Sequence, residues 1–70
     1  MSVGEKIRIL LRRRNMTIKA LAERIGESRQ NLTAKLNRDN LTESEIKKIA
    51  AALNCTYDIS FTMKDTGEVI

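Results

Sequence analysis

Two short helical patterns joined by a tight turn that contains a glycine are the feature that most constrains this chain. Thr17 can cap the first helix, and Gly26 follows it at the point where a left-handed residue would end it. Ser28 can cap the second helix, which runs to about residue 37 with Leu32 and Leu36 facing inward. Helices joined by so tight a turn form a helix-turn-helix, and 70 residues leave room for one small domain around it.

Two further helices are predicted, one on each side of this pair. The first begins at Ser2, and Ser2 and Glu5 have the spacing of a capping box. The last begins at Thr42, which has the same spacing to Glu45, and ends near residue 54. The apolar faces of these helices are formed by Val3, Ile7, Leu10 and Leu11 in the first and by Ile46, Ile49, Ala50 and Leu53 in the last.

After residue 55 the apolar residues alternate with polar ones, which is typical of a β-strand. Residues 64–67 have the composition of a turn with a glycine at its end, and residues 68–70 would return as a short strand. We therefore predict a mainly α fold, in which a four-helix helix-turn-helix domain over residues 1–54 is followed by a C-terminal β-hairpin. The hairpin covers residues 55–70 and belongs to the same domain.

The charge of the chain is unevenly distributed. Residues 1–54 carry twelve basic and six acidic side chains, a net charge of +6, whereas residues 55–70 have a net charge of −2. A basic helical part suits a polyanionic partner, above all nucleic acid. Charge alone does little to distinguish a nucleic-acid-binding protein from a well-solvated basic protein.

Several classes of function are disfavoured by what the sequence lacks. It has no histidine, and its one cysteine, Cys55, has no companion, so we expect no metal site, no other cofactor and no internal disulfide. It has neither a glycine-rich phosphate loop nor a pair of acids in a predicted cleft, so we expect no enzyme. No apolar stretch approaches the length of a membrane span, and residues 1–14 do not resemble a signal peptide. A reducing cytoplasm without membrane association is the expected location.

The helix-turn-helix pattern has the residues that a DNA-reading unit needs. The unit requires a small residue where the helices cross, a glycine in the turn and aliphatic anchors for the second helix, and Ala22, Gly26, Leu21 and Leu32 meet these needs. The outward face of the second helix must then be polar or small enough to enter the major groove of DNA. Arg29, Gln30, Thr33 and Ala34 form such a face.

The run MTIKALAERIGES over residues 16–28 resembles the Xre-like, Cro/repressor-type helix-turn-helix family, also termed lambda-repressor-like. In that family the second helix carries a Leu-Ala pair and ends at a glycine, which Ser or Thr follows shortly after. The resemblance covers roughly residues 3–54, and short regulators of phages and mobile elements look similar over the whole length. It implies a cytoplasmic, sequence-specific binder of double-stranded DNA, a transcriptional regulator that is commonly a homodimer and commonly a repressor.

The resemblance also implies roles for individual residues. The chain departs from the family pattern in three places. Ile18 stands where a glutamine is frequent, and the second aliphatic anchor of the reading helix, Leu36, comes one residue later than usual, after Lys35. Many members also have a fifth helix where this chain has the predicted hairpin. Base edges would be read by Arg29, Gln30, Thr33 and Ala34, and the DNA backbone would be contacted by Thr17, Lys19, Ser28, Asn31, Lys35, Asn37, Arg38 and Asn40.

Two segments allow alternative interpretations. The run over residues 12–14 favours a solvated helix end over a phosphate contact, because consecutive helical residues point about 100° apart. The apolar face of the hairpin either packs on the helices of its own chain or forms a homodimer interface, and we favour the homodimer. As an alternative function, the hairpin would bind a different protein, which would make the chain an antitoxin or an adaptor. The residues of this predicted interface are Tyr57, Ile59, Phe61, Met63 and Val69.

Overall fold

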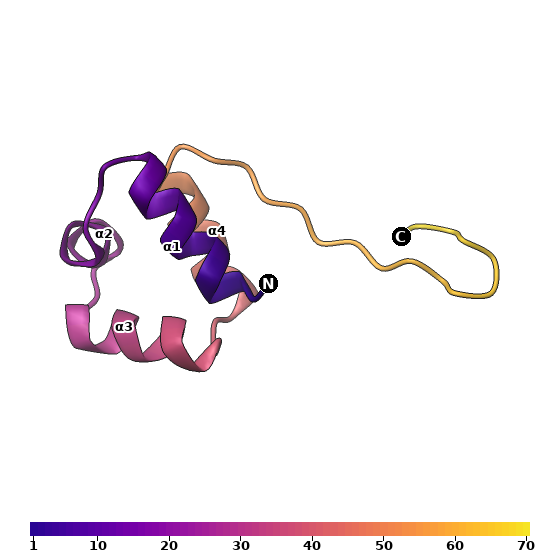
Figure 1. Cartoon of the computed structure of the whole chain (residues 1–70), viewed down its shortest axis with the longest axis horizontal. Coiled ribbons are helices and arrows are strands. Elements are labelled where there is room, and N and C mark those ends of the chain that lie inside the picture. The colour runs from indigo at the N-terminus through magenta and orange to yellow at the C-terminus, as the bar shows by residue number, and fades with distance from the viewer.

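The computed structural model describes all residues 1–70 and contains four helices (Figure 1). These are α1 (Val3–Arg13), α2 (Ile18–Ile25), α3 (Arg29–Arg38) and α4 (Glu43–Ala52). The prediction of a mainly helical, four-helix domain is confirmed, and none of the helices is long and apolar enough to cross a membrane.

Each helix begins at a side-chain cap. The hydroxyl groups of Ser2, Thr17, Ser28 and Thr42 each accept a hydrogen bond of 3.1 Å from the backbone N–H three residues later. The predicted capping box is complete at Thr42, because the Glu45 carboxylate accepts from the Thr42 backbone N–H in return. At Ser2 only the serine half of the box is formed. A capping pattern in the sequence thus predicted all four helix starts.

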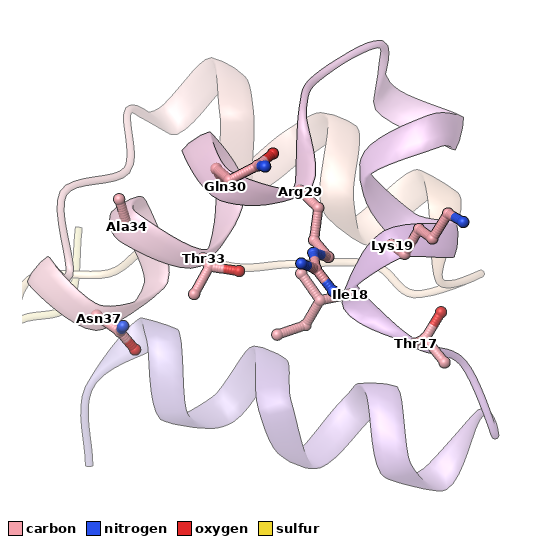
Figure 2. Close-up of a pocket in the computed structure, with 8 residues that line it drawn as sticks. All are labelled: Thr17, Ile18, Lys19, Arg29, Gln30, Thr33, Ala34 and Asn37. Carbon is pink, nitrogen blue, oxygen red and sulfur yellow. The ribbon is translucent and has the colours of Figure 1, made fainter.

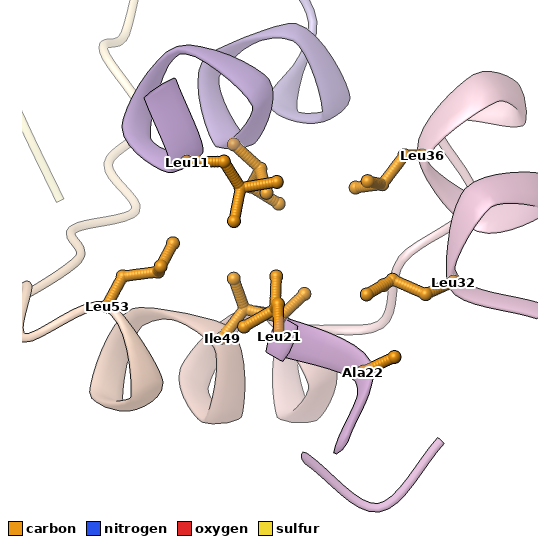
Figure 3. Packing of buried hydrophobic residues seen from close by; sticks show 8 residues of the cluster. Leu11, Leu21, Ala22, Leu32, Leu36, Ile49 and Leu53 are labelled. Carbon is orange, nitrogen blue, oxygen red and sulfur yellow. The ribbon is translucent and has the colours of Figure 1, made fainter. Parts of the chain in front are cut away.

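The core lies between the four helices and is formed by aliphatic side chains from each of them. α3 packs against α1 and α2, while α2 also packs against α4. Leu21 and Leu32, at the centre of the helix-turn-helix, are fully buried. The helix-turn-helix is therefore part of the core, and α3 is held from two sides (Figure 3). The core cluster consists of Ile7, Leu11, Leu21, Ala22, Leu32, Leu36, Ile49 and Leu53.

The C-terminal segment differs from the prediction. The structure contains no β-strand, so the predicted β-hairpin is not supported. A single isolated antiparallel bridge joins Thr62 to Val69, and the backbone amides of Phe61 and Ile70 each donate to the other residue's carbonyl. One isolated bridge is too short to form a strand pair, and a lone two-stranded hairpin is only marginally stable in water.

This C-terminal segment, residues 56–70, extends away from the helices as an arm (Figure 1). Its anchor on the helical body is Tyr57, whose hydroxyl group donates to Glu43 Oε1 on α4 at 3.3 Å. The arm packs on its own helices only at its start, where Tyr57 and Ile59 line a hollow together with residues of α1 and α4. Tyr57, Ile59, Phe61, Met63 and Val69 are 38–73% exposed.

Candidate nucleic-acid interface

The turn between α2 and α3 is built as the sequence predicted. Gly26 adopts a left-handed conformation with φ of +75°, which a glycine adopts without steric penalty. The next backbone N–H, that of Glu27, donates to the Ala22 carbonyl at 2.9 Å and closes the end of α2. Ala22 and Leu32 are buried on either side of this turn, so the orientation of α3 relative to α2 is fixed by packing.

An open groove of about 810 Å³ follows the outer face of α3 and continues onto the start of α2 (Figure 2). No acidic side chain lines it, whereas two basic ones do. All four residues predicted to read bases lie in it, together with three of those predicted to contact the DNA backbone. The lining consists of Thr17, Ile18, Lys19, Arg29, Gln30, Thr33, Ala34 and Asn37.

The other five residues predicted to contact the DNA backbone lie beside this groove. Ser28 caps α3 and lines a neighbouring hollow together with Lys19, Arg29 and Gln30. A third hollow also lies along α3 and shares Ala34 with the main groove. The predicted contact residues therefore lie in three neighbouring hollows around α3, and those of the third hollow are Asn31, Lys35, Arg38 and Asn40.

Lys35 differs from the rest because its charge is already paired. Its Nζ lies 2.6 Å from Glu27 Oε1 in the turn and also contacts Glu45 Oε2 on α4. The hydrogen bond to Glu27, and then that to Glu45, raises the pKa of Lys35. On the acid side, the hydrogen bond from Lys35 and then that from the Thr42 backbone lower the pKa of Glu45 to about 2. Lys35 therefore connects α3 to its two neighbours, while Leu36 provides the buried anchor.

A model of the Cro/C1-type helix-turn-helix DNA-binding domain matches residues 6–58, which include most of α1, all of α2, α3 and α4, and the start of the arm. The chain belongs to the Cro/C1-type family. It is thus a DNA-binding regulator, and the resemblance inferred from residues 16–28 is confirmed. Comparisons with curated proteins and with solved structures gave no significant match.

Two arginines of this Cro/C1-type domain bind the end of α4 and do not line the groove along α3. Arg14 Nε donates to the Leu53 carbonyl at 3.0 Å, and Arg24 Nη1 donates to the Ala52 carbonyl at 3.2 Å. These carbonyls lie at the C-terminal end of α4, where backbone acceptors have no partner within the helix. The basic run over residues 12–14 is thereby divided, because its third member is engaged with α4.

The sequence-based reasoning did not single out Arg8. Its Nη2 donates to Asn37 Oδ1 at 2.6 Å, which joins α1 to the end of α3. Arg8 also lines a hollow with Arg12 and Ile18, and Ile18 is shared with the main groove. The spacing of four residues between Arg8 and Arg12, which places both on one helix face, is the sequence signal that could have revealed them.

Proposed function

We propose that this protein is a sequence-specific transcriptional repressor that inserts α3 into the major groove of double-stranded DNA. The observation that supports the proposal most is that Arg29, Gln30, Thr33 and Ala34 line one open groove without an acidic side chain. A surface that must approach a polyanion closely needs this combination of exposure and positive charge.

The side chains of the groove fit base edges chemically. Arg29 can donate two hydrogen bonds to the two acceptors of a guanine, and Gln30 can pair with the acceptor and donor of an adenine. Each such pair contributes about 1–3 kcal/mol of discrimination against a wrong base. Thr33 and Ala34 lie one turn further along α3, where small side chains allow the helix to approach the bases and the thymine methyl group.

We assign contacts with the DNA backbone to the residues around the groove. Thr17 and Lys19 at the start of α2, and Ser28 and Asn31 at the start of α3, lie where exposed side chains and backbone N–H groups can hold phosphates. Such contacts set the position of the protein on DNA without reading its sequence. Lys35 would act indirectly by orienting α3. At the end of α3 and in the loop after it, we assign phosphate contacts to Asn37, Arg38 and Asn40.

Repression follows from occupancy of a promoter. Blocking the access of a polymerase requires only that the α2–α3 surface stays bound to the DNA. Activation requires a second surface that recruits the polymerase. A reporter gene placed behind the bound sequence would decide between the two, since repression lowers its expression.

We further propose that the protein acts as a homodimer through its arm. Ile59, Phe61 and Val69 expose large apolar side chains that a second copy could cover. Dimers of such readers bind two half-sites roughly 34 Å apart, which increases affinity for a two-fold symmetric operator. Sedimentation equilibrium should give a dimer at micromolar concentration, and a monomer well above this range would refute the proposal.

The same exposed apolar residues support a second candidate function. An arm that binds a different protein would make this chain an antitoxin or an adaptor, with or without DNA binding. A co-transcribed neighbouring gene whose product forms a stable 1:1 complex with the arm would favour this candidate. Loss of that complex upon Phe61→Asp would assign it to the arm.

The main proposal is tested by selecting binding sites from random double-stranded DNA. We expect a two-fold symmetric motif, and we expect the double variant Arg29→Ala/Gln30→Ala to lose the preference for it while keeping weak, salt-dependent binding. The matched control is Lys47→Ala/Lys48→Ala, which changes two exposed residues on α4 outside all three hollows around α3. Failure of the wild-type protein to enrich any motif would refute sequence-specific reading.

A further inference from the structure

The α1 side of the main groove carries a second basic cluster that the reading of bases does not use. Arg8 is half-buried, and its Nη2 donates to Asn37 Oδ1 at 2.6 Å. Asn37 lies at the end of the groove next to α1 (Figure 2). The hydrogen bond therefore places a guanidinium group of α1 at the edge of the surface that α3 presents.

This hydrogen bond fixes which chemistry Asn37 presents. A guanidinium group has five N–H donors and no acceptor, so Arg8 holds the carbonyl oxygen of the Asn37 amide. The Nδ2 group of Asn37, with its two donors, is left for another partner, and so are further N–H groups of Arg8. The free groups of the pair are thus mainly hydrogen-bond donors, which suits an acceptor-only, negatively charged group.

Arg12 extends the cluster along the same face of α1. It lies four residues after Arg8, and both line the hollow that shares Ile18 with the main groove. No acidic side chain lines this hollow, and no ion pair of Arg8 or Arg12 is present. Two guanidinium groups whose charges are uncompensated thus border the groove on one side.

We propose that Arg8, Arg12 and Asn37 form a phosphate-binding site for the DNA backbone that passes along α1. Arginine binds phosphate oxygens with two parallel N–H groups, and the amide of Asn37 adds a third donor in a fixed orientation. The site rests on the proposed function, because it needs DNA in the main groove. It adds a contact on the α1 side to those assigned to the starts of α2 and α3.

The first test compares single charge removals on α1. Fluorescence anisotropy would measure the affinity of Arg8→Met and Arg12→Met for the selected operator and for an unrelated duplex between 50 and 200 mM salt. Each variant should weaken binding to both duplexes by a similar factor, and should lower the slope of log affinity against log salt by about 0.9, the value for one lost phosphate contact.

The matched controls remove the same charge elsewhere on α1. Arg13 lies outside both hollows, and Lys6 lines a different groove between α1 and α4. Arg13→Met and Lys6→Met should therefore leave the salt slope unchanged. If they lower it as much as Arg8→Met and Arg12→Met do, the effect is one of net charge and the proposed site is refuted. Because Arg12 is exposed and pairs with no other residue, its variant tests the site even if Arg8→Met unfolds.

A second test addresses the orientation of the amide. Asn37→Asp replaces the Nδ2 donor by an anionic acceptor and should weaken binding more than Asn37→Ala does. The double variant Arg8→Met/Asn37→Ala should lose less than the product of the two single losses, since the pair acts as a unit. Equal losses for Asn37→Asp and Asn37→Ala would refute the donor role. A wild-type protein that selects no motif would instead refute the proposed function itself.

Discussion

Gly4 decides how closely α1 and α3 can approach each other. A Cβ atom at this position would lie 2.3 Å from the backbone carbonyl oxygen of Leu36. The backbone N–H of Gly4 also donates to Asp39 Oδ1 at 3.0 Å, and Asp39 ends α3 in a left-handed conformation. The start of α1 is therefore fixed to the end of α3 by a contact that only the smallest residue permits.

Gly4→Ala should accordingly destabilise the fold, although alanine is the better helix former by about 1 kcal/mol. The added methyl group meets backbone that no rotamer change can move, so α1 must shift away from α3. We expect a net loss of about 2 kcal/mol, seen as a fall in Tm of roughly 10 °C for a domain of this size. The control is Lys6→Ala, which changes an exposed residue of the same helix and should change Tm little. A Gly4→Ala protein that is more stable than the wild type would contradict the packing argument.

At the scale of the elements, the orientation of α3 depends on charge as well as on packing. Lys35 joins α3 to Glu27 in the turn and to Glu45 at the start of α4, where Glu45 also completes the capping box. Because the pKa of Glu45 lies at about 2 in the folded protein, below its ordinary value of 4.5, its ionised form is stabilised by folding. This contribution to stability is present above pH 4.5 and is lost as the pH falls toward 2.

Glu45→Gln should therefore melt below the wild-type protein at pH 7, and the difference should shrink as the pH falls from about 5 toward 2. Glutamine keeps the carbonyl oxygen that accepts from Thr42, so the substitution removes the charge but not the cap. Thermal melts followed by circular dichroism at several pH values would measure the effect. A difference in Tm that is constant over this range would show that the ion pair with Lys35 does not stabilise the fold.

The C-terminal end of α4 is also stabilised by side chains from other parts of the chain, one after α1 and one on α2. Arg14 and Arg24 supply donors to carbonyl groups of the last turn of α4, at Leu53 and Ala52. Arg14→Met should lower the free energy of unfolding by about 1 kcal/mol without changing the salt dependence of DNA binding, because this guanidinium faces α4. Urea unfolding would measure the change in stability, and fluorescence anisotropy on the same sample would measure the salt dependence of DNA binding. A weaker salt dependence in the variant would indicate that Arg14 contacts the DNA and not α4.

At the scale of the whole molecule, the helical body and the arm differ in character. The body carries a net charge of +6 over residues 1–54 and has its own core, whereas the arm exposes apolar side chains and extends from one end (Figure 1). The longest dimension of the molecule, 43 Å, is about twice the other two, 22 and 19 Å. The apolar side chains of the arm are therefore largely exposed, and a partner could cover them.

The double substitution Ile59→Asp/Phe61→Asp should abolish the proposed dimer and leave the helices folded. Both side chains are exposed in the single chain and neither belongs to the core cluster, so we expect the helices to stay folded. We expect sedimentation to give a monomer, and the dependence of Tm on protein concentration that a dimer confers to disappear. Lys64→Asp/Thr66→Asp, in the same arm, is the control for added negative charge, and a monomer there as well would argue against an apolar interface.

The sequence by itself determined the helices and the family. Four capping hydroxyl groups, at Ser2, Thr17, Ser28 and Thr42, mark the helix starts, and the left-handed Gly26 marks the turn, because caps and turns depend on residues close in sequence. The groove residues of α3 were predictable for the same reason. An apolar stripe fixes which face is buried, and so which face is left for the groove.

The tertiary structure alone decided the features that join distant residues. The ion pairs of Lys35, the bond from Arg8 to Asn37 and the cap that Arg14 provides for α4 connect side chains that lie 8 to 39 residues apart. The alternating pattern after residue 55 predicted strands that did not form. Alternation describes only one strand, whereas a β-ladder needs a partner strand and a surface to cover. The arm pairs with itself only through the single bridge between Thr62 and Val69.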